Sequence, residues 1–135
     1  MERSTSPVII PLEKSYPVLR IAAEQATINW KKLAISTTDE VRFIPYDDII
    51  YCMSTSNYST IFLRDGKSYF CSRTLKDIED KLPKESFLRI HHSYLVNLHC
   101  ITSLKRKTGE MEIENKVLLP VSRTQKKALY GMLGL

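Results

Sequence analysis

The chain has 135 residues, enough for one domain with a hydrophobic core and too few for two domains of ordinary size. Apolar residues make up 43% of it and charged residues 26%, as in ordinary globular proteins, and no apolar run approaches the roughly 18 residues of a membrane span. The net charge of +5 is uneven, because residues 101–135 hold seven basic and three acidic side chains. This excess predicts a basic patch for an acidic partner, or else a solvated lysine-rich terminus.

Residues 1–30 are predicted to form an N-terminal helical extension. The first sixteen hold Pro7 and Pro11 among serines and threonines, which indicates an extended leader, and they lack the apolar segment of a secretory signal. A helix is predicted over 17–29, because proline is favoured at a first helical position and the apolar residues there partly follow helical spacing. We therefore expect a cytoplasmic protein with one domain over 31–135.

After Trp30 the pattern changes to short runs that are rich in β-branched and aromatic residues and bounded by turn-forming residues. The predicted strands are 32–36, 41–45, 49–53, 58–64, 67–71, 87–90, 94–104, 110–114 and 116–120. Asp65-Gly66 predicts a hairpin with a type I′ turn, in which both central residues need positive φ. So many short strands predict a mainly β domain.

Two short helices are predicted among these strands. Thr74 is a good N-cap for a helix whose apolar residues share one face, and Pro83 ends that helix. Ser122-Arg123-Thr124-Gln125 has the form of a capping box and begins the second helix, which continues to about residue 133.

Cysteine and histidine give little sign of chemistry. The chain has three cysteines: Cys52, Cys71 and Cys100. Each stands alone in an apolar run, which predicts buried thiols in a reducing cytoplasm. His91, His92 and His99 suggest a metal site, but adjacent strand residues point to opposite faces unless a turn intervenes, and no acidic residue lies at a ligand-like spacing. We therefore expect no catalytic, metal or cofactor site, and a metal-binding protein that uses the histidine and cysteine set is the less favoured alternative.

The start of the second helix suits DNA. Arg123 would lie in its first turn, where free backbone N–H groups favour a phosphate and a guanidinium can make a bidentate contact with guanine. Lys126 and Lys127 could add phosphate contacts. The alternative for Arg123 is a solvated arginine paired with a glutamate of strand 110–114. The polar turns at His92-Ser93 and Asn57-Tyr58 could likewise contact DNA, or only satisfy their own backbone groups.

A set of short motifs across residues 31–133 resembles the LytTR family, the LytR/AlgR-type bacterial DNA-binding domain. The motifs are Asp48-Ile49-Ile50-Tyr51, Asn57-Tyr58, Asp65-Gly66-Lys67, Leu82-Pro83, Phe87-Leu88-Arg89-Ile90-His91, Ser93-Tyr94-Leu95-Val96-Asn97 and Pro120-Val121-Ser122-Arg123. The resemblance implies an elongated stack of small antiparallel β-sheets with short helices. It also implies the output domain of a two-component response regulator that binds repeated sites in double-stranded promoter DNA, as a homodimer on DNA.

The resemblance further implies which residues contact DNA. They are Asn57, Tyr58, His92, Ser93, Arg123 and Lys126, and His92 stands where many members carry arginine, lysine or asparagine. We therefore expect a sequence-specific, non-catalytic regulator of transcription with no small-molecule substrate. The main alternative is a protein-interaction or dimerisation module that uses residues 1–30.

Overall fold

Short antiparallel strands joined by tight turns account for most of the structure, a computed structural model that describes residues 30–135. Residues 31–135 form one compact unit. The helix predicted over 17–29 lies outside the described residues. Within residues 30–135, neither helix is long and apolar enough to cross a membrane.

Ten strands and two α-helices follow one another along the described residues. They are β1 (Lys32–Ser36), β2 (Val41–Pro45), β3 (Ile49–Thr55), β4 (Tyr58–Leu63), β5 (Ser68–Cys71), α2 (Leu75–Lys81), β6 (Phe87–His91), β7 (Tyr94–Asn97), β8 (Ile101–Leu104), β9 (Glu110–Ile113), β10 (Val117–Pro120) and α3 (Arg123–Met132). The mainly β fold predicted from the sequence is confirmed.

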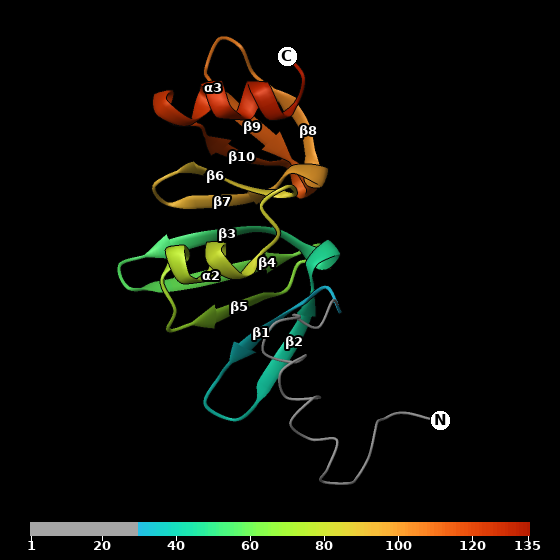
Figure 1. Cartoon of the computed structure of the whole chain (residues 1–135), viewed down its shortest axis with the longest axis vertical. Helices are drawn as coiled ribbons and strands as arrows, with labels where there is room; N and C mark the ends of the chain where they lie inside the picture. The colour runs from blue at the N-terminus through green and yellow to red at the C-terminus, as the bar shows by residue number, and fades with distance from the viewer. Residues whose placement is uncertain (1–29) are drawn as a thin grey trace, which may run out of the picture. The chain divides into compact units, whose positions relative to one another are not determined.

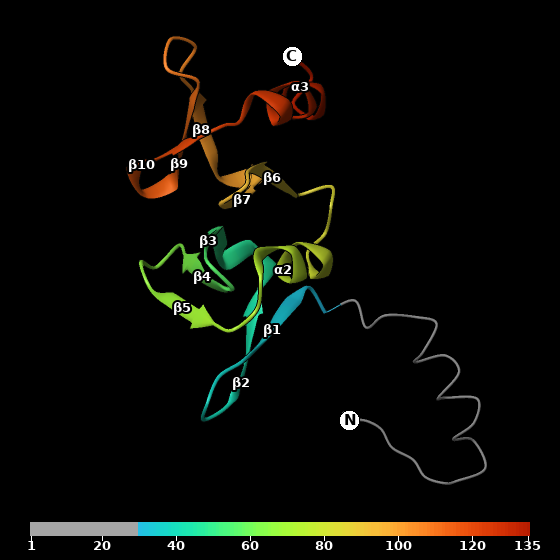
Figure 2. The same cartoon turned by 90° about the vertical axis from the view of Figure 1, so that its left-hand side faces the viewer.

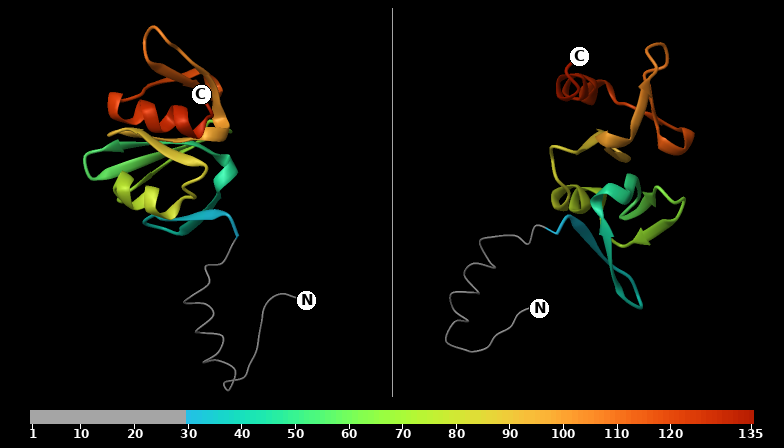
Figure 3. Two further views of the ribbon diagram at one scale, coloured as in Figure 1. Left: turned by 45° about the horizontal axis from the view of Figure 1, so that its top comes forward. Right: turned by 90° about the vertical axis from the view of Figure 1, so that its right-hand side faces the viewer.

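The strands form three antiparallel sheets (Figure 1). A central sheet has the order β5-β4-β3-β7-β6, the hairpin β1-β2 makes a second sheet, and β10-β9-β8 makes the third. The views in Figure 3 show the central sheet between the β1-β2 hairpin at one end of the unit and α3 with β8–β10 at the other.

Two hydrophobic cores cover the central sheet on opposite faces. Successive residues of a strand point to opposite faces, so Leu95 of β7 enters one core and Val96 enters the other. The first core contains Ile78 of α2 and Leu33 of β1. The second contains Leu129, the fully buried residue of α3. The central sheet therefore packs against a hydrophobic core on each face, and this packing limits the movement of the turns at its ends.

The hairpin predicted at Asp65-Gly66 forms, but the predicted type I′ turn is wrong. Gly66 has a φ of 89°, whereas Asp65 is not among the residues with positive φ. The N–H of Leu63 donates to the carbonyl of Lys67, and that of Gly66 donates to the carbonyl of Leu63. This is a three-residue loop that needs only one left-handed residue, which glycine supplies at no steric cost.

The single strand predicted over 94–104 is also wrong, because a 3-10 turn at Leu98–Cys100 divides it into β7 and β8. The Asn97 side chain is buried and accepts from the N–H of His99 at 3.0 Å, which turns the chain. Its amide also donates to the carbonyl of Ile49 at 2.9 Å. Asn97 thus ends the strand in the central sheet and sends the chain to the third sheet.

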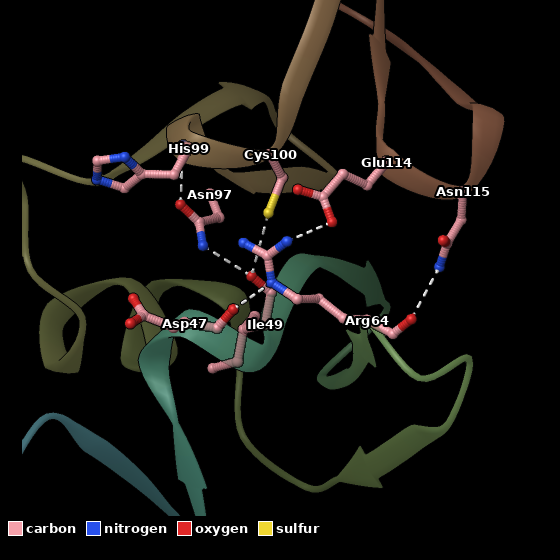
Figure 4. Close-up of polar contacts among 8 residues, drawn as sticks. All are labelled: Asp47, Ile49, Arg64, Asn97, His99, Cys100, Glu114 and Asn115. Carbon is pink, nitrogen blue, oxygen red and sulfur yellow. Dashed lines mark hydrogen bonds and ion pairs between the residues drawn. The ribbon is translucent and has the colours of Figure 1, made fainter.

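Arg64, after β4, joins the central and third sheets through polar contacts (Figure 4). Its guanidinium donates to the carbonyl of Asp47 at 2.6 Å and forms an ion pair with Glu114, which follows β9. The Asn115 side chain donates to the carbonyl of Arg64 at 3.4 Å. These contacts hold together segments that are about 50 residues apart in the sequence.

Candidate nucleic-acid interface

The β6–β7 turn consists of His92 and Ser93, two of the residues predicted to contact DNA. Its backbone is held by side chains on either side. Arg89 donates from Nη2 to the carbonyl of His92 at 2.5 Å, and the N–H of Ser93 donates to Nδ1 of His91 at 3.1 Å. Because the fold satisfies these backbone groups, the exposed side chain of His92 is not needed to hold the turn.

The β3–β4 turn, which carries Asn57 and leads into Tyr58, lies beside the β6–β7 turn. The N–H of Ser54, near the end of β3, donates to the carbonyl of Ser93 at 2.9 Å, so the strand that leads into the β3–β4 turn is joined to the β6–β7 turn. Asn57 is exposed, Tyr58 is 45% exposed, and the Tyr58 ring stacks on Phe70 of β5 with 5.2 Å between ring centroids. The structure thus brings together two turns that are far apart in the sequence.

The start of α3 is attached to the same region through β6. A β-bulge interrupts the pairing of β6 with β7 between Arg89 and His91. The carbonyl of Ile90, within the bulge, accepts from the N–H of Ser122 at 2.8 Å. Ser122 is the N-cap of α3, and its hydroxyl accepts from the N–H of Gln125 at 3.3 Å.

The predicted capping box is therefore only half correct. In a complete box the glutamine side chain would accept a hydrogen bond from the N–H of Ser122. Here that N–H donates to the carbonyl of Ile90 instead. The side chain of Gln125 instead lines a groove beside the β6–β7 turn. The start of α3 therefore lacks the hydrogen bond between Gln125 and the Ser122 N–H, and it is hydrogen-bonded to β6 of the central sheet instead.

That open groove, of about 480 Å³, lies between the β6–β7 turn and the start of α3. It is lined by Glu79, Arg89, His91, His92, Ser122, Thr124 and Gln125. Figure 1 shows the β3–β4 turn, the β6–β7 turn and the start of α3 along one edge of the unit, and Figure 2 looks onto that edge. We call this edge, made of these three segments, the reading edge.

Arg123 and Lys126 lie on α3 but do not line this groove. Arg123 is exposed and forms no ion pair within residues 30–135. Of the glutamates in strand 110–114, Glu114 pairs with Arg64 and Glu112 with Lys105, and Glu110 forms no ion pair within the described residues. The alternative in which Arg123 pairs with a glutamate of strand 110–114 is therefore wrong. The ammonium of Lys126 lies 5.6 Å from the centre of the Tyr130 ring.

The structure adds polar and basic residues that the sequence did not single out for contact. Thr124 and Gln125 line the groove, although the sequence indicated only a capping role for this segment. Lys105, Arg106 and Lys107 are exposed in the β8–β9 turn, and Lys105 lines a small cavity together with Lys126. The sequence predicted a break between strands 94–104 and 110–114, and these three residues contribute to the charge excess of residues 101–135, but none of them was singled out.

The rings of His91 and His92 lie together, with centroids 4.2 Å apart, because the turn begins at His92. The sequence-based expectation that adjacent residues point to opposite faces held only where no turn intervenes, and here a turn begins at His92. Burial lowers the pKa of His91, and the nearby His92 lowers it further. A neutral His91 is also what the geometry requires, since its Nδ1 accepts a hydrogen bond.

The three cysteines are free and buried, as predicted. Burial raises the pKa of the Cys52 thiol, and it raises that of the Cys100 thiol to about 11. Such thiols are poor nucleophiles near neutral pH. Among residues 30–135, no group of three or more histidine, cysteine or acidic side chains is arranged to hold a metal ion.

Comparison with known proteins gives several relatives. The sensory transduction protein LytT of Bacillus subtilis is 33% identical over 105 residues, which cover 76% of this chain and 43% of LytT. The CO-responsive transcriptional regulator RcoM of Rhodospirillum rubrum is 29% identical over 109 residues, which cover 78% of this chain and 46% of RcoM. The chain thus spans less than half the length of these two curated relatives.

The fold and the family agree with these matches. A solved LytTr DNA-binding domain of a Bacillus cereus protein has the same fold, with a TM-score of 0.68, 23% identity, and coverage of 78% of this chain and 98% of that one. The family model of the LytTr DNA-binding domain matches residues 39–134, well over half of the chain. The chain therefore belongs to the LytTr DNA-binding domain family.

Proposed function

We propose that residues 31–135 form a sequence-specific, double-stranded DNA-binding domain that regulates transcription in the cytoplasm and has no catalytic activity. The observation that carries this proposal is the reading edge, on which two polar turns and a capped helix start are joined by the Ser54–Ser93 and Ser122–Ile90 hydrogen bonds. Exposed polar segments that are held in fixed positions can enter the major groove. The base edges in that groove carry a distinct hydrogen-bonding pattern for each base pair.

Base reading and backbone binding would be divided among different residues. His92, Ser93 and Asn57 on the two turns can donate to and accept from base edges. Arg123, exposed and without an ion pair within the described residues, can bind guanine in a bidentate manner. Phosphates would be bound by Lys126 and by the basic β8–β9 turn, and these contacts would supply much of the affinity.

Repeated promoter sites would each be read by one copy of this domain, and two copies would form a homodimer on the DNA. Sedimentation with duplexes that carry one or two copies of the bound site tests this part. We expect one chain on the first duplex and two on the second. A single chain on both duplexes would refute the paired arrangement and leave the DNA-binding proposal intact.

The salt dependence of binding tests the electrostatic part of the proposal. Neutralising several phosphates releases counterions, so log K should fall steeply as log salt rises. Lys126→Ala should make the slope shallower by about one unit. The matched control is Lys84→Ala, an exposed lysine in the α2–β6 connection away from the reading edge, which should leave the slope unchanged. A flat response in the wild type would refute the phosphate contacts.

A further inference from the structure

Arg89 is a basic residue in direct contact with the β6–β7 turn, yet its guanidinium binds groups of the protein itself. Its Nη2 donates to the carbonyl of His92 at 2.5 Å, and its Nη1 lies 3.7 Å from a carboxylate oxygen of Glu79 on α2. The side chains of Arg89 and Glu79 are only 27% and 29% exposed. An arginine at a DNA-facing edge usually binds phosphate. Here the two terminal nitrogens of the Arg89 guanidinium contact the carbonyl of His92 and the carboxylate of Glu79 instead.

We propose that Arg89 is a positioning residue that fixes the β6–β7 turn for base reading and does not itself bind DNA phosphate. This inference rests on the DNA-binding function proposed above and names a residue that acts through His92. The guanidinium holds the His92 carbonyl, and Glu79 holds the guanidinium, so α2 determines the position of the turn through two polar contacts.

The surrounding contacts explain why the turn needs such a residue. The N–H of Ser93 is held by His91 and its carbonyl by Ser54, which fixes the second residue of the turn. The carbonyl of His92 lies beyond the last ladder pair, His91 with Tyr94, and Arg89 supplies its donor. A charge-assisted hydrogen bond is shorter and stronger than a neutral one. Without it, the peptide between His92 and Ser93 keeps only the neutral hydrogen bond from the Ser93 N–H to His91, and its orientation is less tightly fixed.

Two substitutions separate positioning from phosphate binding. Arg89→Lys keeps the charge but loses the planar fork that contacts two partners at once, and Arg89→Met removes the charge while it keeps an apolar stem. We expect both variants to lose roughly tenfold in the ratio of affinities for the selected and a scrambled duplex, with the slope of log K against log salt unchanged, as expected when no phosphate contact is lost. Lys126→Ala serves as the reference for a phosphate contact.

The opposite pattern would overturn the inference. If Arg89 bound phosphate, Arg89→Lys would keep both affinity and slope, and Arg89→Met would weaken both duplexes equally with a slope shallower by about one unit. Glu79→Gln separates the two roles in a second way. If Arg89 positions the turn, this variant should have a lower ratio of affinities for the selected and the scrambled duplex. Phosphate binding instead predicts tighter binding of both duplexes once the competing carboxylate is gone.

Amide hydrogen exchange of the full chain without DNA gives a readout that does not depend on DNA binding. In Arg89→Met the Ser93 N–H should exchange at least several-fold faster, while the amide of Leu129 in the second core keeps its wild-type rate. Equal Ser93 rates in variant and wild type would overturn the inference. If the wild type itself showed no preference among duplexes, the proposed function would be refuted. The proposed role of Arg89 in base reading would then be refuted too. A failure confined to the Arg89 variants refutes only this inference.

Discussion

The N–H of Ser54 donates to the carbonyl of Ser93 at 2.9 Å, and this contact joins the end of β3, which leads into the β3–β4 turn, to the β6–β7 turn. In the proposed complex, two turns held in this way would present their side chains to the duplex at a fixed separation. The contacts proposed for them should therefore depend on each other, as contacts within one connected network do.

Coupling between the turns can be measured with Asn57→Ala, His92→Ala and the double variant on the selected duplex. We expect the two losses in binding free energy to differ from additivity by about 0.5 kcal/mol or more, the usual size for connected residues. The control pair is Asn57→Ala with Lys84→Ala, which should add within about 0.5 kcal/mol. Strict additivity in the first pair would show that the turns act independently.

Arg123→Ala should reduce discrimination at one guanine of the site by roughly 1–3 kcal/mol, the range for a bidentate base contact. The measurement compares the selected duplex with duplexes in which each guanine is replaced in turn. Arg123→Lys keeps the charge without the bidentate geometry and should also discriminate poorly. Equal loss on every duplex would reduce Arg123 to a phosphate contact.

His91 predicts a particular dependence of stability on pH. Burial and then His92 lower its pKa below the ordinary value of 6.5, so the neutral form is favoured in the folded state. Its contribution to stability is therefore complete above about pH 6.5 and is lost as pH falls below that value toward the folded-state pKa. Urea unfolding of the wild type between about pH 5 and 8, where histidine changes charge, should show this loss.

His91→Asn is the matched variant for that measurement, because the asparagine carbonyl can accept from the Ser93 N–H but does not titrate. His92 and His99 remain in both proteins, so the difference between the two pH profiles isolates His91. We expect the variant to lose less stability than the wild type below pH 6.5. Parallel profiles would show that His91 carries no such linkage.

The ion pair between Arg64 and Glu114 predicts a modest effect on stability. Glu114→Gln removes the charge of a partly exposed pair but keeps a side chain that can accept a hydrogen bond. The free energy of unfolding should fall by about 1 kcal/mol or less at low salt, and the difference should shrink at high salt. A loss well above that, unaffected by salt, would show that Glu114 acts through packing.

The sequence predicted those parts of the fold that depend on local pattern. The bounds of β1 and β2 match the expected runs, and the N-cap Thr74 accepts from the N–H of Asp77 as expected. The break after β7 was missed, because the Asn97 side chain that turns the chain at His99 is also held by a hydrogen bond to Ile49, 48 positions away. Strand propensity alone favours one continuous strand there.

The reading edge was predictable only in pieces. The polar character of the turns and the exposed Arg123 follow from the sequence, and the family resemblance suggested which of them contact DNA. Their joining depends on backbone hydrogen bonds of Ser54 and Ser122, and no side-chain pattern reports such bonds. The role of Arg89 was hidden for the same reason, since its partners are a backbone carbonyl and a side chain of α2.

Selection of bound sequences from a pool of random duplexes, with the full chain as bait, tests the central claim most directly. The account predicts that one recurring motif is enriched and that this duplex binds at least about a thousandfold more tightly than a scrambled one, the lower range for specific DNA-binding proteins. It also predicts that His92→Ala and Arg123→Ala change the enriched motif. A pool without enrichment, bound equally well in every sequence, would contradict the account.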